Sequence, residues 1–301
     1  NPDGSEGLGD RLVPKLGLDL NSGRDFDLGE GQDLRLQIGP GGVLELFSGP
    51  GKKQLKMPNK GDAKALKSLK QAQKDLEKQL AFQKLRLDRA MYQGRRWSVD
   101  AFERDLRSHP LLKPLMFGLV WGLYLEGEER PQCAVCLNRE GAFVDLNQQP
   151  ADLTAVQAIG LVHPLEILPT LQNWRELWDQ ELRVQPFEQL MREIFIPSLA
   201  ELHKTQLPDP GKVASGKVLA LINQADWKAP KDSEGLLCKE LGRGLLAELT
   251  LEYHVWALKE YPEVEVFHVL LRRSESYGEV RLDEIHLIAY SELRRDLARL
   301  L

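Results

Sequence analysis

The chain has 301 residues, of which 42% are hydrophobic and 28% are charged, and this is the composition of a globular protein. Its net charge of -5 argues against nucleic-acid binding along its whole length, and its three cysteines, an odd number, argue against a secreted disulfide scaffold. No apolar run approaches the roughly 20 residues of a membrane span. Because the chain begins at Asn1 and shows no signal peptide, we expect a cytoplasmic fragment of a longer protein.

Positive charge is concentrated in one part of the chain. Between Lys52 and Arg96, fourteen Lys and Arg residues stand against four Asp and Glu residues, a surplus of ten positive charges. The remainder of the chain must therefore be strongly acidic, since the total is -5.

The first 61 residues predict a β-rich segment. Residues 1–24 are rich in Gly and Asp and are expected to form a mobile lead-in. Apolar and polar residues alternate over 34–38, a Gly-Pro-Gly-Gly turn follows at 39–42, and a second apolar run covers 43–47. This pattern predicts a β-hairpin, to which residues 52–57 would add a third short strand.

A long helix is predicted to begin after Asp62, which is a suitable N-cap. Its apolar residues follow the spacing of one helix face and are Ala65, Leu69, Ala72, Leu76, Leu80 and Leu87. A second face carries a row of lysines, which are Lys67, Lys70, Lys74 and Lys78. These lysines are either a solvated face whose stems cover the core, or an anion-binding face for nucleic acid or an acidic protein.

The next stretch predicts two helices and a hairpin. Ser98 is expected to cap a helix over 99–107, and the His-Pro pair at 109 is expected to begin a buried helix that extends to Tyr124. Residues 132–145 predict a second hairpin, which contains Cys133 and Cys136. Strand residues three apart point to opposite faces, and no second ligand pair follows at zinc-like spacing, so we expect structural thiols and no metal site.

The second half of the chain mixes strands and helices. We expect a strand at 156–161, a helix after Thr170, a break at Pro186 and a further helix over 187–194. The prolines at 208 and 210 suggest an internal boundary. Beyond it, the pattern predicts a helix at 213–223, strands at 245–251, 264–271 and 285–290, and a last helix at 292–301.

These segregated elements predict an α+β fold, in which a helical central region with short antiparallel β-hairpins is followed by a C-terminal lobe of strands and helices. The predicted domains are a β-rich lead segment at 1–61, a helix-rich core at 62–207 and a C-terminal α+β lobe at 208–301 that packs on the core.

Several short motifs occur in one order along the chain. They are RLDRAM (86–91), RRWSVDAF (95–102), HPLLKPLMFGLVWG (109–122), LVHPLEI (161–167), WRELW (174–178), VQPFEQLMREIF (184–195) and SELRRD (291–296). As an ordered set they resemble the bacterial molybdate-metabolism-regulator-like (MolR-like) domain of unknown function, which is often found C-terminal to a WGR domain. The resemblance implies a bacterial, intracellular, multidomain protein, in which N-terminal domains of the same chain are expected partners. WGR domains elsewhere bind nucleic acid, but this chain contains none.

No phosphate loop, G-x-S-x-G elbow or H-E-x-x-H motif occurs in the chain. What remains is a set of polar residues without a template, which are His163, Glu166, Gln185, Glu188, Gln189, Arg192, Glu193, Ser291, Glu292, Arg295 and Asp296. A histidine beside a carboxylate could act as a general base, and Arg192 or Arg295 could clamp a phosphate or carboxylate. The other interpretation is a structural network in which these groups satisfy one another.

The sequence therefore favours a non-enzymatic binding or regulatory module, which would bind nucleic acid or an acidic protein through the basic helix. The alternative is an uncharacterised enzyme, or a binder of a small anion such as phosphate or a nucleotide, that uses His163, Glu188 and Arg192. A third possibility is a scaffold for a neighbouring domain. We expect no cofactor, no metal and no membrane partner.

Overall fold

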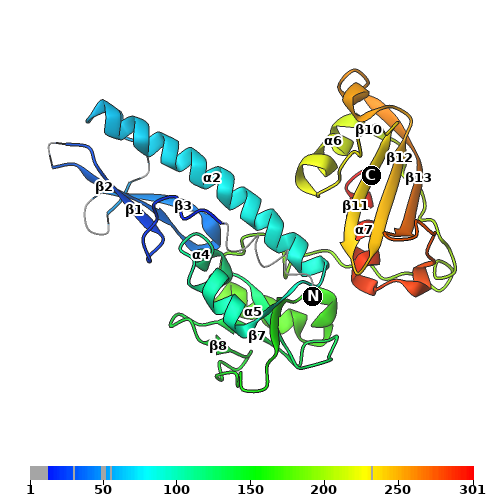
Figure 1. The fold of residues 1–301 in the computed structure, drawn as a ribbon, viewed down its shortest axis with the longest axis horizontal. Helices are drawn as coiled ribbons and strands as arrows, with labels where there is room; N and C mark the ends of the chain where they lie inside the picture. The colour runs from blue at the N-terminus through cyan, green and yellow to red at the C-terminus, as the bar shows by residue number, and fades with distance from the viewer. Residues whose placement is uncertain (1–12, 30, 49–51, 55, 232) are drawn as a thin grey trace. The chain divides into compact units, whose positions relative to one another are not determined.

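The computed structural model describes residues 13–29, 31–48, 52–54, 56–231 and 233–301, and the fold is α+β, as predicted (Figure 1). The chain divides into two compact units. Unit 1 contains the described residues up to Asp88 together with Arg96–Val162 and Glu166–Met191. Unit 2 contains Arg89–Arg95, His163–Leu165 and Arg192–Leu301. The three domains expected from the sequence stay a prediction.

Unit 1 begins with a four-stranded antiparallel sheet in the order β1-β2-β3-β4. Its strands are β1 (Gly23–Asp27), β2 (Asp33–Ile38), β3 (Leu44–Ser48) and β4 (Lys52–Gln54). The predicted hairpin is confirmed, since β2 pairs with β3 and their connection η1 (Pro40–Gly42) holds the turn glycines. Gly41 and Gly42 have φ of 64° and 72°, which other residues rarely adopt. Strand β1 was missed because it lies partly in the expected lead-in, of which residues 1–12 are outside the described part.

Helix α2 (Ala63–Tyr92) runs beside this sheet (Figure 1). Its start is as predicted, because the Asp62 carboxylate accepts a hydrogen bond from the Ala65 backbone N–H at 2.8 Å. The apolar face is confirmed as well, since Leu69 and Leu76 are completely buried. The amphipathic pattern thus fixes which side of α2 faces the core.

A five-stranded antiparallel sheet in the order β5-β9-β6-β7-β8 forms the second part of unit 1. Its strands are β5 (Arg96–Ser98), β6 (Val120–Tyr124), β7 (Cys133–Leu137), β8 (Phe143–Val144) and β9 (Ala158–Leu161). The hairpin predicted at 132–145 and the strand predicted at 156–161 are confirmed as β7-β8 and β9. Beside them, Ser98 caps α3 (Val99–Ala101) as predicted, and this turn continues into the π-helical η2 (Phe102–Arg107).

The long buried helix predicted at 109–124 is wrong. Only α4 (Lys113–Met116) is helical, and the chain turns at Gly118 into the central strand β6. A side chain at Gly118 would collide with the Val184 carbonyl oxygen, 2.1 Å from the position of a Cβ. Trp121 on β6 is fully buried and meets the Phe102 ring edge to face at 4.9 Å. The end of the apolar run, Val120–Tyr124, is therefore a fully buried strand, which periodicity does not distinguish from a buried helix.

Helix α5 (Leu171–Gln180) follows η3 (Pro164–Glu166) and η4 (Leu168–Thr170). The helix predicted after Thr170 is confirmed. The Thr170 hydroxyl, however, donates to the Ile167 carbonyl and does not cap this helix. The helix predicted over 187–194 is wrong, because this stretch is irregular. The Gln185 side chain accepts from the backbone N–H groups of Gln189 and Leu190, which bends the chain locally.

Unit 2 is an antiparallel sheet in the order β10-β13-β12-β11 with two helices. Its elements are β10 (Gly211–Ala214), α6 (Ser215–Gln224), β11 (Leu236–Gly242), β12 (Leu245–Leu251), η5 (Val255–Lys259), β13 (Glu263–Arg273), η6 (Leu282–Glu284) and α7 (Leu287–Ala298). The strands predicted at 245–251 and 264–271 are confirmed. The strand predicted at 285–290 is wrong, because α7 already begins at Leu287.

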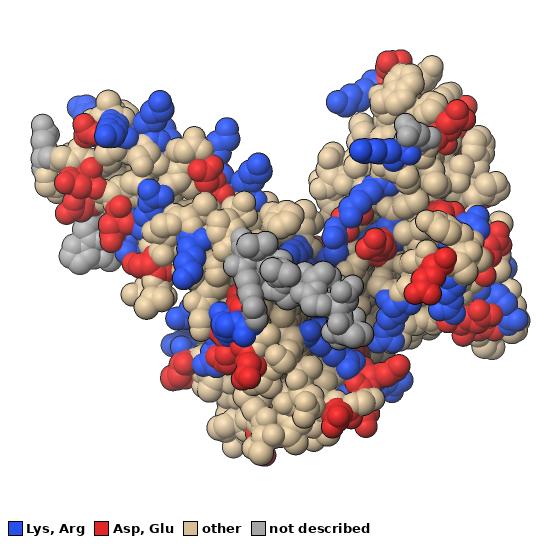
Figure 2. Space-filling model, viewed as in Figure 1, with Lys and Arg blue, Asp and Glu red and all other residues tan. Residues whose placement is uncertain are grey.

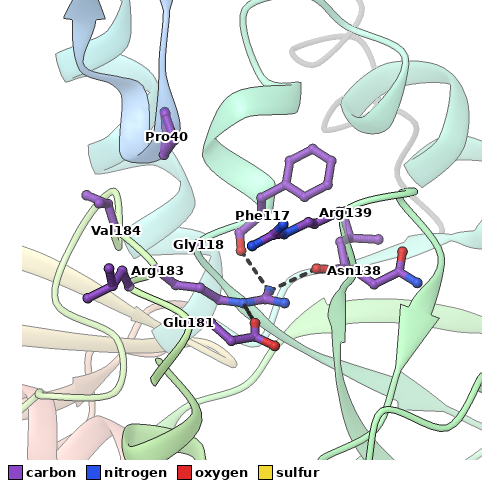
Figure 3. Close-up of a pocket in the computed structure, with 10 residues that line it drawn as sticks. Pro40, Phe117, Gly118, Asn138, Arg139, Glu181, Arg183 and Val184 are labelled. Atoms are coloured by element: carbon purple, nitrogen blue, oxygen red, sulfur yellow. Dashed lines mark hydrogen bonds and ion pairs between the residues drawn. The ribbon is translucent and has the colours of Figure 1, made fainter. Parts of the chain in front are cut away.

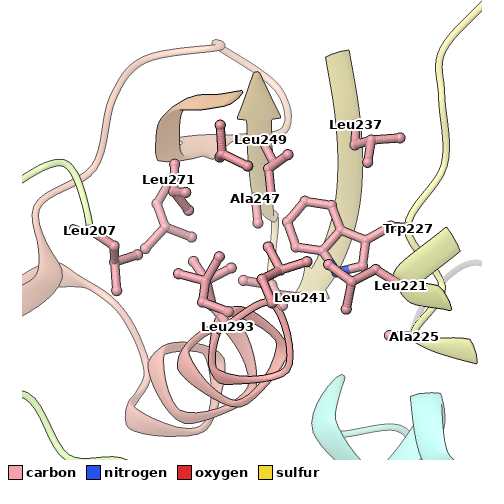
Figure 4. Close-up of a cluster of buried hydrophobic side chains, with 14 of the residues drawn as sticks. Leu207, Leu221, Ala225, Trp227, Leu237, Leu241, Ala247, Leu249, Leu271 and Leu293 are labelled. Atoms are coloured by element: carbon pink, nitrogen blue, oxygen red, sulfur yellow. The ribbon is translucent and has the colours of Figure 1, made fainter. Parts of the chain in front are cut away.

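The core of unit 2 lies between one face of this sheet and helices α6 and α7. Figure 4 shows Leu293 of α7 directed at the strands, with the Trp227 indole near Leu221 and Leu237. The inward strand residues alternate with outward ones, as in Leu245, Ala247, Leu249 and Leu251 of β12. The inward-facing strand residues pack against α7. Four polar residues of α7 are buried as well, and they are Ser291, Glu292, Arg295 and Asp296.

Candidate functional site

Three residues that the sequence singled out meet in the interior of unit 2. Arg192 donates to Glu292 through Nε and a terminal nitrogen, each at 2.6 Å from a carboxylate oxygen. The His163 Nε2 lies 3.1 Å from Glu292 Oε1. All three side chains are almost fully buried, with 2% or less of each residue exposed. Glu292 is thus held by a two-point arginine contact and by a histidine.

The proton on His163 can be placed from its hydrogen bonds. The Leu165 backbone N–H donates to His163 Nδ1 at 3.2 Å, so Nδ1 acts as the acceptor. The proton of the neutral ring is then on Nε2, which donates to Glu292 Oε1. A neutral imidazole therefore satisfies both of its partners.

Burial alone would raise the pKa of Glu292, because it disfavours the charged carboxylate. The Arg192 guanidinium and the hydrogen bond from His163 act in the opposite direction and prevail, and they hold the pKa of Glu292 well below its usual value. The neighbouring Ser291 Oγ accepts from the Phe195 backbone N–H at 3.0 Å, which joins the segment after Arg192 to α7. These contacts stabilise a charged carboxylate as part of the fold.

A second buried pair follows on the same helix, four residues after Glu292. Asp296 Oδ2 accepts from the Lys239 Nζ at 2.6 Å and from the Trp227 indole N–H at 2.9 Å. Arg299 adds a contact of 3.7 Å to the other carboxylate oxygen. The Lys239 ammonium also lies 4.7 Å from the centre of the Tyr92 ring. The sequence singled out Asp296 but missed Lys239 and Trp227.

Both carboxylates on α7 are therefore neutralised by buried cations within unit 2. Two nitrogens of Arg192 already donate to the Glu292 carboxylate, so they are not available to a ligand. Neither Arg192 nor Glu292 has more than 2% of its surface exposed. Glu188, the third member of the alternative site, is an exposed residue of unit 1. The arrangement of Arg192, His163 and Glu292 is that of a satisfied structural network.

The remaining candidates of the polar set occupy separate places. Tyr124 lies with its hydroxyl 3.5 Å from Glu166 Oε1 in unit 1. Glu193 is exposed, and Arg295 is buried on α7 with 8% of its surface exposed. The sequence grouped these residues by proximity along the chain, and the structure distributes them.

Gln189 has a specific structural role in unit 1. Its side-chain oxygen accepts from the Val120 backbone N–H at 2.8 Å, and its nitrogen donates to the carbonyls of Val120 and Val162 at 2.8 and 2.9 Å. One buried amide thus satisfies three backbone groups at the ends of β6 and β9. Gln189 thus attaches the irregular stretch 187–194 to the five-stranded sheet through hydrogen bonds.

Replacing Gln189 by Met should lower the free energy of unfolding by about 2–3 kcal/mol, because the backbone groups at Val120 and Val162 lose their buried partner. The change keeps the side-chain length, so urea unfolding measured by circular dichroism reports the lost hydrogen bonds. Gln180→Met is the matched control, since Gln180 is an exposed glutamine of unit 1 and the same change there should alter stability by less than about 0.5 kcal/mol. Equal stability of Gln189→Met and the wild type would contradict this role.

The lysine face is defined as Lys67, Lys70, Lys74 and Lys78 of α2. All four residues are exposed, and Figure 2 shows Lys and Arg atoms along this helix. The face spans twelve residues, and its first and last lysines are about 16 Å apart along the helix axis. No carboxylate among the described residues forms an ion pair with any of the four.

A pocket of about 170 Å³ in unit 1 was not predicted from the sequence. Figure 3 shows Arg183 at its wall, where the guanidinium donates to the carbonyls of Phe117 and Leu137 at 3.1 and 2.9 Å and pairs with Glu181. Arg183 also lies 4.8 Å from the Trp178 ring. Since its donors hold the backbone of unit 1, Arg183 is a structural residue of this wall.

The two cysteines of β7 have different surroundings. Cys133 is exposed, whereas Cys136 is fully buried and its pKa is raised by burial to about 11. A thiol with this pKa stays protonated at neutral pH, which is the state of a structural cysteine. Within the described ranges, no three His, Cys, Asp or Glu side chains are grouped so as to hold a metal ion. Among the described helices, none has the length and hydropathy that crossing a membrane requires.

Comparison with known proteins places the chain in a family. The uncharacterized protein YehI of Escherichia coli (strain K12) is 32% identical to it in an alignment of 237 residues that covers 74% of this chain and 19% of YehI. The chain thus spans about a fifth of the length of this curated relative. No solved structure matches the chain. A family described as a domain of unknown function, DUF4132, matches residues 51–227, which is more than half of the 301 residues. The chain therefore belongs to the DUF4132 family.

Proposed function

We propose that this chain is a non-enzymatic binding module that engages an anionic partner through the lysine face. The observation that carries the proposal is the row of four exposed lysines on one side of α2, none of them paired with a described carboxylate. Ammonium groups in such a row attract a line of negative charges and release their counterions on contact. Because α2 is a single helix of 30 residues, the lysines keep a fixed spacing before the partner arrives.

The alternative, an enzyme or small-anion site at His163, Glu188 and Arg192, receives less support. An anion site needs an arginine with donors directed into an accessible space. Arg192 instead bonds Glu292 at two points and is almost fully buried. A phosphate would have to displace a carboxylate that the protein already supplies.

The sequence resemblance supports a regulatory role, a MolR-like relationship and a neighbouring WGR domain, and it implies an intracellular location. The matched family is described only as a domain of unknown function, and YehI only as uncharacterized. Because the chain spans 19% of YehI, other parts of a longer protein are natural partners for this module. We therefore propose a partner of anionic character.

Reversing the lysine face tests the proposal. We expect a labelled DNA duplex, a single-stranded RNA and a polyglutamate peptide to bind with an anisotropy change that weakens as salt is raised. If all four lysines make contacts with a duplex, the affinity should fall roughly a hundredfold between about 50 and 200 mM salt. The variant K67E/K70E/K74E/K78E should abolish binding of the anionic probe that the wild type prefers.

A matched control separates the lysine face from net charge. The variant K204E/K228E/K231E/K259E makes the same change in charge at exposed lysines of unit 2 and should bind as the wild type does. Absence of binding by the wild type at low salt, or equal loss in both variants, would remove the lysine face as a binding site.

A further inference from the structure

The exposed side of α2 continues beyond the lysines with apolar residues. Phe82 follows Lys78 by four residues and Leu85 follows Phe82 by three, so both lie on the same stripe as the lysine face. Their exposed fractions are 59% and 44%, although both are large apolar side chains. The stripe from Lys67 to Leu85 covers nineteen residues, and its ends are about 27 Å apart along the helix axis.

These two residues are not part of the core face of α2. The buried residues Leu69, Leu76, Leu80 and Leu87 lie about half a turn away, on the side that packs inside unit 1. The helix therefore has its core side filled and still presents Phe82 and Leu85 outward. A surface that is basic over its first turns and apolar over its next turns is suited to a partner with the complementary order of charge and hydrophobicity.

We propose that this stripe docks an acidic amphipathic protein segment rather than nucleic acid, and this inference rests on the proposed function of the lysine face. Carboxylates of such a segment would face Lys67, Lys70, Lys74 and Lys78, while its apolar side chains would cover Phe82 and Leu85. A duplex phosphate backbone matches the lysines alone, because it offers no apolar surface to cover Leu85. A helix that lays apolar anchors at spacings of three and four along another helix matches both parts.

The test uses three probes of similar negative charge. The first is a helical peptide of about 20 residues, long enough to follow the stripe, with glutamates toward one end and leucines toward the other. The second replaces its leucines with glutamines, and the third is a short DNA duplex. We expect the amphipathic peptide to bind the wild type about tenfold or more tightly than the glutamine peptide, since apolar anchors supply much of the affinity of such contacts.

Substitutions at the apolar end of the stripe complete the test. The variant F82S/L85S should bind the amphipathic peptide as weakly as the glutamine peptide, while its affinity for the glutamine peptide and the duplex stays unchanged. The variant L20S/L182S is the matched control, because these leucines are 78% and 85% exposed elsewhere in unit 1 and their loss should change nothing. Circular dichroism and urea unfolding check that each variant is folded.

The outcomes separate this inference from the proposed function. If the K67E/K70E/K74E/K78E variant keeps full affinity for every probe, the lysine face is not a binding site and both proposals fail. If binding depends on the lysines but F82S/L85S loses nothing, or the duplex binds more tightly than the amphipathic peptide, only the inference about the partner fails. An aromatic ring can also stack on an unpaired base, so tighter binding of a single-stranded RNA than of the amphipathic peptide, lost in F82S/L85S, likewise overturns the protein partner.

Discussion

Replacing Glu292 by Gln should lower the free energy of unfolding by about 3–5 kcal/mol, because the change removes the carboxylate that contacts the buried Arg192 guanidinium at two points. Glutamine keeps the shape of the side chain but offers one neutral oxygen in place of the carboxylate that Arg192 now grips at two points. The amide nitrogen would also face a donor, either Arg192 or the His163 Nε2. Urea unfolding at neutral pH, followed by circular dichroism, measures the loss.

Two controls separate the charge effect from simple truncation. Glu193→Gln makes the same chemical change at an exposed neighbour of Arg192 and should alter stability by less than about 0.5 kcal/mol. The double variant Arg192→Met with Glu292→Leu removes both charges and should be more stable than Glu292→Gln alone, since the buried guanidinium is removed together with the carboxylate that it contacts. A Glu292→Gln protein as stable as the wild type would show that this network does not hold α7.

The same carboxylate makes stability depend on pH in the acid range. Its pKa in the folded protein is well below the ordinary value of 4.5, so the folded form binds its proton less readily than the unfolded chain. A lowered carboxyl pKa contributes stability that is fully present above the unfolded pKa and is lost as pH falls through the folded pKa. We therefore expect the stability gap between the wild type and Glu292→Gln to be constant near neutrality and to narrow below about pH 4.5. A constant gap down to acid pH would contradict the assignment.

The sequence predicted those elements whose pattern has one interpretation. The apolar spacing and the Asp62 cap of α2, and the alternation of β12, correspond to a single periodicity each. The run at 109–124 shows no single periodicity, because most of its residues are apolar. In such a run the sequence of a buried strand resembles that of a buried helix. The stretch 187–194 has helical spacing but forms no helix. The Gln185 side chain accepts hydrogen bonds from backbone N–H groups that a helix would use, and the Gln189 side chain bonds the sheet instead.

The sequence predicted some residues of the buried networks and not others. His163, Arg192 and Glu292 were singled out, but their meeting depends on contacts between residues up to 129 positions apart, which local patterns do not reveal. Lys239 carries a signal that the sequence alone makes visible. It lies between Leu237 and Leu241 on the inward face of β11, and a lysine at a core position of a strand requires a buried partner. The charge on α7 nearest to it is Asp296.

Replacing Asp296 by Asn should also lower the free energy of unfolding strongly, by about 3–5 kcal/mol. Lys239 would then keep its charge in the core of unit 2 without a carboxylate. Lys239→Met should cost less, about 2–3 kcal/mol, since Asp296 retains the Trp227 indole N–H and the more distant Arg299. The order of the two losses is the informative quantity, because loss of packing alone would make the lysine change the larger one.

Urea unfolding of both variants gives that order, and Lys228→Met is the control at an exposed lysine. Removing both charges with Lys239→Met and Asp296→Leu should recover part of the stability lost in Asp296→Asn. Glu292 and Asp296 lie four residues apart on one side of α7, so each buried cation fixes a different turn of the same helix. If Asp296→Asn costs no more than Lys228→Met, the carboxylate does not neutralise Lys239 in the folded protein, and apolar packing around Leu293 holds α7 in place.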